Sequence, residues 1–127
     1  MARFDNETGD ASLNRFVDAL TDTVTVQLAE AGDGQFSVVG NAAILRAPRQ
    51  DRDLRAIAST LHAGFVVLGQ VQRDDQRVRV LAHLIRMPDQ THVRVSRTDN
   101  VPDTTLTEAD EVAGRIAREF SQAAATH

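Results

Sequence analysis

Four arginines in the second half of the chain have the charge and spacing to hold an anionic ligand. Two lie on one strand-like segment and two on the next, at Arg77, Arg79, Arg94 and Arg97. If the two segments pair, the guanidinium groups form a basic strip on the outer face of a sheet, where forked hydrogen bonds can hold a carboxylate or a phosphate. The same residues can instead form an ordinary solvated face, paired with Asp and Glu side chains. The sequence leaves both interpretations open.

The opening stretch RFDNETGD, residues 3–10, is rich in oxygen donors and could be a metal-binding loop. A calcium loop of the EF-hand type needs a Gly at its sixth position and a Glu at its twelfth. Counted from Asp5, these positions are Asp10 and Phe16, so the template fails. We interpret the stretch as a turn in which Phe4 closes a strand in the core and Asp10 meets the amino end of a helix.

Two pairs of titratable residues also have suggestive spacing. Asp18 and Asp22 are one helical turn apart, but acid–base catalysis needs a pocket and a perturbing neighbour. The simpler interpretation is that the two carboxylates are solvated or structural, with Asp18 acting as a cap or pairing with an arginine such as Arg55. His83 and His92 can lie side by side on adjacent strands, although two histidines without a carboxylate make a weak metal site. We therefore predict no catalytic residue, no metal site and no cofactor.

The composition excludes several classes of function. The net charge is −4 and aromatic residues make up 4% of the chain, so it has neither a basic field nor a stacking platform for nucleic acid. The absence of cysteine excludes disulfides and thiol nucleophiles, and the absence of lysine excludes lysine Schiff bases. No apolar run approaches the roughly 20 residues of a membrane span. We expect no contact with nucleic acid and no membrane insertion by this chain.

Hydrophobic periodicity predicts the elements that must position these side chains. Apolar residues recur every three or four positions in three segments typical of amphipathic helices, at 12–31, at 53–61 and from Thr105 onward. Alternating or continuous apolar runs predict strands at 1–4, 35–39, 64–72, 77–85 and 91–97. The expected fold is α/β (α+β), a mixed sheet of about five strands with three helices packed on it, in the order β-α-β-α-β-β-β-α.

Alternation along the last two strands predicts which side chains face the helices. On the strand 77–85, the buried face should carry Val78, Val80, Ala82 and Leu84. On the strand 91–97, we expect Val93 and Val95 to point inward. The outward side chains of that strand should be His92, Arg94 and Ser96. The place of Arg94 in the basic strip depends on this assignment.

Six blocks of sequence carry a family resemblance: FDNETGD at 4–10, DALTDTV at 18–24, DLRAIASTLHA at 53–63, FVVLGQVQRDDQRVRVLAHLI at 65–85, VRVSRTD at 93–99 and ADEVAGRIA at 109–117. Together they span nearly the whole chain, and they resemble the TolB N-terminal-like domain of bacterial adenylate cyclases, CadC-type winged-helix regulators and TPR-containing proteins. They are also similar to the flagellar FlgO domain. The family pattern has Pro, Gly, Glu and Trp at four positions where this chain has Arg3, Ala19, Leu68 and Arg94.

The resemblance implies a noncatalytic regulatory or scaffolding module that sits beside an output domain, often with TPR repeats after it and often beyond a membrane helix. That placement is periplasmic, whereas a soluble cyclase-type arrangement is cytoplasmic. We therefore predict a sensory or protein-interaction module of a bacterial signalling protein, which contacts a neighbouring output domain or a partner protein. A sensor that binds a small anion at the arginine strip is the first alternative, and an uncharacterised enzyme is the last.

The length and the opening residues bear on domain organisation. A chain of 127 residues has the size of one domain with a real core. The opening MARF is only half of a strand of ordinary length. We therefore expect residues 1–127 to be a single domain cut from a longer multidomain protein. The half-strand and the arginine strip are the surfaces at which we expect a partner to dock.

Overall fold

A four-stranded mixed sheet forms the centre of the protein. The structure, a computed structural model, describes residues 1–32, 38–39, 45, 47, 49–75, 77–101 and 105–126. The strands lie side by side in chain order: β1 (Asp5–Asn6), β2 (Phe65–Asp74), β3 (Arg77–Arg86) and β4 (Thr91–Val101). β1 runs parallel to β2, and the other neighbouring strands are antiparallel.

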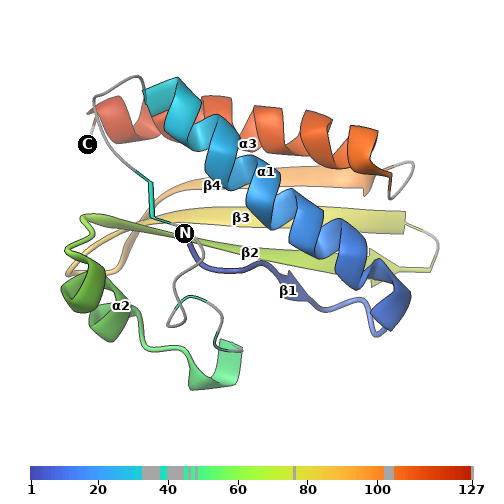
Figure 1. Ribbon diagram of the computed structural model, residues 1–127, viewed down its shortest axis with the longest axis horizontal. Coiled ribbons are helices and arrows are strands. Elements are labelled where there is room, and N and C mark those ends of the chain that lie inside the picture. Colours follow the sequence, from blue (N-terminus) through green and yellow to red (C-terminus); the bar gives the residue numbers. More distant parts are fainter. Residues whose placement is uncertain are drawn as a thin grey trace.

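Helices cover the two faces of the sheet unequally. The long helices α1 (Asn14–Gly32) and α3 (Leu106–Thr126) lie together on one face, which we call the inner face (Figure 1). The short helix α2 (Leu54–Leu61) lies against one end of the other face, the outer face (Figure 1). Two short 3-10 turns, η1 (Ala11–Leu13) and η3 (Arg49–Asp51), precede α1 and α2. Much of the outer face is therefore not covered by any of the described helices.

The fold class predicted from the sequence is confirmed, with one difference in the strand count. All three helices form within a few residues of the expected bounds, and Asp53 caps α2 by accepting hydrogen bonds from Arg55 N and Ala56 N. The described residues contribute four strands to the sheet rather than about five. The missing strand was expected at 35–39, of which only Val38 and Val39 are described, and neither is in a strand.

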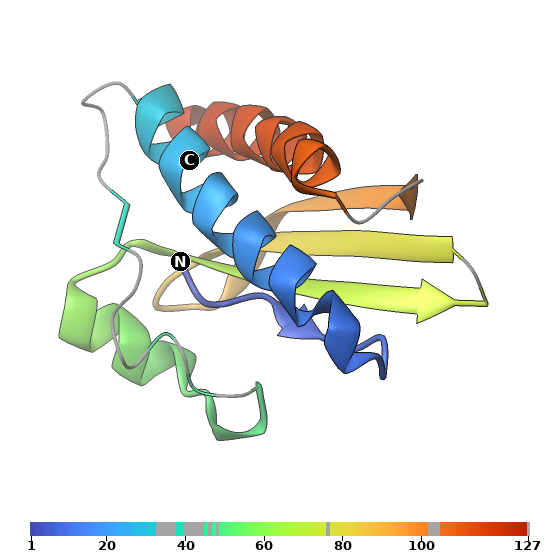
Figure 2. The same cartoon turned by 45° about the vertical axis from the view of Figure 1, so that its right-hand side comes forward.

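Two hydrophobic clusters hold the layers together. The larger cluster lies between the inner face and the two long helices, and its most deeply buried large side chains include Phe4, Leu20, Val71, Ile116 and Phe120. The smaller cluster lies under α2 on the outer face and contains Ala2, Leu45, Ile57, Val66, Ile85 and Met87. Figure 2 shows the sheet between these two layers, with α1 and α3 on one side and α2 on the other.

One contact in the larger cluster requires a glycine. The ring of Phe4 lies directly on Gly69 of β2, and a Cβ atom added at Gly69 would be 2.4 Å from Phe4 Cε2. Real Cβ atoms do not approach other carbons so closely, because packed interiors are already near the density of a crystal. Phe4 is 1% exposed and has little room to move aside. Gly69 therefore provides the space that the ring occupies.

We predict that Gly69→Ala destabilises the protein by about 1–3 kcal/mol, because the added methyl group overpacks the core against Phe4. Gly64→Ala is the matched control, since a Cβ at Gly64 meets no atom within 4 Å. Its effect should stay within about 0.5 kcal/mol. Urea unfolding followed by circular dichroism measures both changes. Equal effects of the two substitutions would show that Phe4 does not rest on Gly69.

Candidate functional site

Three of the four candidate arginines come together at one end of the outer face. Arg77 and Arg79 of β3 and Arg97 of β4 line a hollow of about 550 Å³, together with Asp99 of β4. We call these four residues the arginine basin. The other lining residues are Glu7, Gln72, Arg73 and Val78. The hollow lies at the end of the sheet where β2 turns into β3.

Asp99 holds two of the three arginines of the basin in place. Its two carboxylate oxygens accept separate hydrogen bonds, one from Arg79 Nε at 2.8 Å and one from Arg97 Nε at 2.8 Å. The hydrogen bond from Arg97, with the further bond and charge of Arg79, lowers the pKa of the Asp99 carboxyl group. The side chains of all three residues remain about half exposed. The carboxylate thus stays ionised and holds two guanidinium groups at the rim of an accessible hollow.

The fourth candidate, Arg94, lies on the opposite face of the sheet. Leu84 pairs with Arg94 but Ile85 pairs with His92, so β4 has one extra residue at this point. Such a β-bulge reverses the alternation of side chains beyond it. Arg94 consequently points to the helix layer, where its Nε atom is 3.8 Å from Glu119 Oε2 of α3.

The predicted facing of β4 is therefore wrong beyond the bulge. Val95 is 47% exposed although it was expected to point inward, and Ser96 is buried although it was expected to point outward. His92 and Val93 lie before the reversal and face as predicted, since His92 meets His83 and Val93 packs against the larger cluster. The strip of four arginines becomes a group of three, and its binding function stays a prediction.

From Asn6 to Asp10 the opening stretch is a hydrogen-bonded turn, as predicted, but the strand before it is β1 at Asp5–Asn6 rather than one that Phe4 closes. Asn6 Oδ1 accepts hydrogen bonds from Thr8 N at 3.1 Å and from Thr8 Oγ1 at 2.6 Å. Asn6 Nδ2 donates to the carbonyl oxygen of Asp10, and Gly9 adopts a positive φ of 76°. Asp10 accepts a hydrogen bond from Ser12 N and so caps the turn that leads into α1. These side chains are used to shape the backbone.

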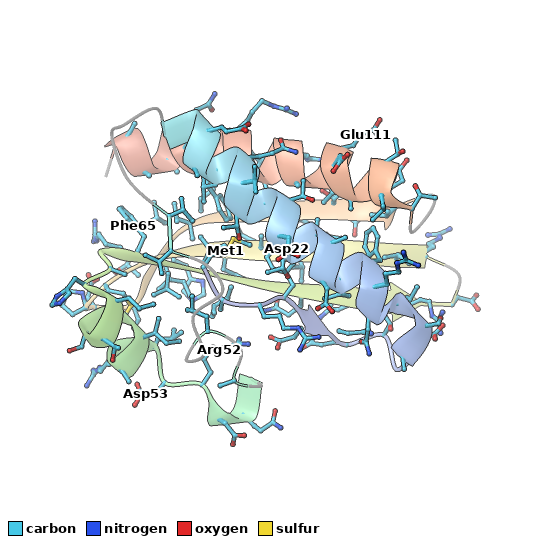
Figure 3. All side chains as sticks on the ribbon, in the orientation of Figure 1. Met1, Asp22, Arg52, Asp53, Phe65 and Glu111 are labelled. Carbon is cyan, nitrogen blue, oxygen red and sulfur yellow. The ribbon has the colours of Figure 1, made fainter. Side chains whose placement is uncertain are left out.

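A buried ion pair, which the sequence analysis did not single out, fixes the same stretch from the other side. Arg52 donates to both carboxylate oxygens of Asp5, at 3.2 and 3.1 Å, and also to the carbonyl oxygen of Ala47. Its side chain is 4% exposed. Figure 3 shows Arg52 on the chain that leads into α2, on the side of the sheet away from α1. Only the tertiary fold reveals this pair, because Arg52 lies among other polar residues in the sequence.

The remaining titratable candidates have structural partners or exposed positions. Asp18 pairs with Arg3 at 2.8 Å, so the expectation of a structural ion pair is confirmed while the suggested partner Arg55 is wrong. Asp22 is exposed on α1, as Figure 3 shows. The rings of His83 and His92 lie edge to face with centroids 5.4 Å apart. Within the described residues, no group of three or more His, Cys, Asp or Glu side chains could hold a metal ion.

A second hollow, of about 530 Å³, was not anticipated from the sequence. It lies between the carboxyl ends of α1 and α3 and the start of β2, and most of its walls are apolar. Figure 3 labels two of its lining residues, Met1 and Phe65. Its walls come from segments far apart in the chain, so no local pattern marks it. None of the described helices is both long enough and apolar enough to cross a membrane.

Comparison with known proteins supports a link to adenylate cyclases. No family model matches the chain. The chain is similar to a protein of Rhizobium meliloti (strain 1021) named "Putative adenylate cyclase 3", with 26% identity over 113 residues. The matched stretch is 89% of this chain but only 19% of that protein. The similarity is thus confined to a domain-sized part of a much longer relative.

We predict that the buried ion pair of Asp5 with Arg52 contributes much more to stability than the half-exposed pair of Asp18 with Arg3. Asp5→Ala should lower the free energy of unfolding by about 3 kcal/mol, because it leaves the buried guanidinium of Arg52 without its counter-charge. Asp18→Ala is the control and should cost less than about 1 kcal/mol, since the pair with Arg3 is half exposed. Urea unfolding at pH 7 measures both. A cost for Asp18→Ala as large as that for Asp5→Ala would contradict the assignment.

The hydrogen bonds that Asp99 accepts also predict how its carboxyl group titrates. The folded-state pKa of Asp99 lies below its ordinary value of 3.8, so ionised Asp99 favours the folded state above that pH. The contribution disappears as the pH falls through the folded-state pKa. Carboxyl-carbon NMR should place the Asp99 midpoint below 3.8, and Arg97→Gln should raise it toward 3.8. Arg94→Gln, on the other face, should leave it unchanged; a midpoint that moves equally in both variants would refute a local cause.

Proposed function

We propose that this chain is a noncatalytic sensory or protein-interaction module of a bacterial signalling protein, of the adenylate cyclase or transcriptional regulator type, and that it is a TolB N-terminal-like domain. One observation carries the proposed link to signalling proteins: the similarity to the Rhizobium protein covers 89% of this chain and 19% of that relative. The TolB-like assignment depends on the sequence resemblance alone. A stretch of this size corresponds to one accessory domain within a long chain. Its role is therefore to modulate or position an output domain.

The way in which the chain uses its polar residues supports a noncatalytic role. In the opening stretch, Asn6 shapes a turn, Asp5 forms an ion pair with Arg52 and Asp10 caps the turn that leads into α1. Asp18, the other acid considered for catalysis, pairs with Arg3 in a half-exposed position. A catalytic acid or base needs a place in a pocket beside a substrate. The groups named above instead shape the backbone or pair with an arginine.

We propose that contact with the output domain uses β4 and the part of the outer face beside it. β4 is the last strand of the sheet formed by the described residues, so one edge of its backbone faces outward. Strand edges readily accept another chain. Val95 is 47% exposed near the middle of this strand. The compartment we propose is the periplasm, with the cytoplasm as the alternative.

A domain replacement in the Rhizobium relative tests the proposal. The matching stretch is replaced by this chain or, as a control, by an unrelated domain of similar length, and cyclic AMP is measured in cells that lack other cyclases. We expect this chain to keep output within about threefold of the unmodified protein and the unrelated domain to change it about tenfold or more, as a coupling free energy of 1–3 kcal/mol allows. Equal outputs from the two replacements would contradict a regulatory role.

Surface variants locate the contact within the same chimera. Val95→Asp should shift the cyclic AMP output toward that of the unrelated domain, because it places a charge in the proposed interface. Val26→Asp is the matched control, since Val26 is also an exposed valine, at 56%, but lies on α1. If Val26→Asp changes the cyclic AMP output and Val95→Asp does not, the contact is on the helix layer. Cyclic AMP formed from ATP by the isolated chain would show that the chain is itself an enzyme.

A further inference from the structure

We propose that the arginine basin binds a phosphate group, and that Asp99 is the positioning residue that holds two guanidinium groups ready for it. This inference deepens the sensory side of the proposed function by naming a ligand class. The ligand is a small molecule recognised through its phosphate oxygens. Three features support the inference: the atoms that Asp99 uses, the charge balance of the hollow and the lack of aromatic rings among its described lining residues.

Asp99 contacts the arginines through their inner nitrogens only. Both hydrogen bonds come from Nε atoms, of Arg79 and of Arg97. The Nη nitrogens of these two residues have no acceptor among the described residues. A guanidinium group has five N–H donors, so the four on its Nη nitrogens remain for another acceptor. Asp99 thus holds two guanidinium groups in place without using their Nη–H donors. Those donors can bind a tetrahedral oxyanion.

The third arginine adds a donor that has no competing ion pair among the described residues. Arg77 is exposed, lines the hollow and has no ion pair with any side chain in the described ranges. Arg73, by contrast, is held by Asp10 at 3.1 Å and is less available to a ligand. Glu7 also lines the hollow, where it accepts a hydrogen bond from Gln72 Nε2 at 3.0 Å. Three arginines against Asp99 and Glu7 leave one positive charge in excess, which favours an anion.

The lining residues also limit what part of a ligand is recognised. No aromatic side chain is among the described residues that line the hollow, so it offers no aromatic ring on which a nucleobase could stack. The volume of about 550 Å³ is that of a small-molecule site. Inorganic phosphate and larger phosphate esters should therefore bind through the same contacts. Selectivity among them depends on the phosphate rather than on an attached base.

Binding of inorganic phosphate to the full chain tests the inference. Phosphate is titrated at pH 7.5 and constant ionic strength, and NMR follows the arginine Nε–H signals and the backbone amides. We expect saturable shifts at Arg77, Arg79 and Arg97. Arg97→Gln and Arg77→Gln should each weaken binding about tenfold, the loss expected for a hydrogen bond to a charged group. Arg77→Gln removes no ion pair with a described residue, so it tests the site even if Arg97→Gln disturbs the fold.

Two further variants distinguish a specific phosphate site from nonspecific electrostatic attraction of the anion to the protein. Arg94→Gln removes the same charge from the same strand but on the inner face, so phosphate affinity should stay within about twofold. Asp99→Asn adds a net positive charge, yet it should weaken phosphate binding about fivefold or more because the guanidinium groups lose their anchor. Stronger binding by Asp99→Asn, or equal losses in Arg94→Gln and Arg97→Gln, would overturn the inference. Absence of saturable binding by the unmodified chain would also overturn it, while the chimera separately decides the module's role.

Discussion

The ring of Phe4 on Gly69 is the contact on which the arrangement of the first residues depends. It joins the opening segment to β2 beneath α1, and Thr21 Oγ1 of α1 accepts a hydrogen bond from Phe4 N at 3.0 Å. With Phe4 fixed, Asp5 and Asn6 pair with β2 in a parallel register, and the chain turns directly into α1. Two of the blocks that carry the sequence resemblance, 4–10 and 65–85, therefore touch each other. Packing explains why Phe4 and Gly69 occur together in them.

Local patterns in the sequence predicted the elements better than they predicted the faces and contacts. Apolar periodicity located all three helices, and alternation assigned both faces of β3, because each depends only on neighbouring residues. One extra residue in β4 reversed the facing of Arg94 and Val95, and no local pattern marks that bulge. Partners distant in sequence were also missed, as with Arg52 and Asp5, because their meeting depends on the complete fold.

The unequal covering of the sheet connects the fold to the proposed role. The inner face is closed by two long helices, so its side chains serve stability. The outer face is covered by α2 at one end, and its other end carries the arginine basin beside β4, the last strand of the sheet that the described residues form. The proposed ligand site and the proposed docking edge lie on the same face, so a bound anion would be placed to influence a neighbouring domain. Such an arrangement suits an accessory domain of a signalling protein.

The division of the arginines between the two faces is the central claim, and a nuclear Overhauser spectrum of the protein in solution tests it most directly. We expect cross-peaks from the side chain of Arg94 to Glu119 on α3, and from Arg97 to Arg79 across the outer face. Cross-peaks from Arg94 to Arg79 or Leu81 would place it on the outer face. That result would contradict the bulge, the basin of three arginines and the site built on it.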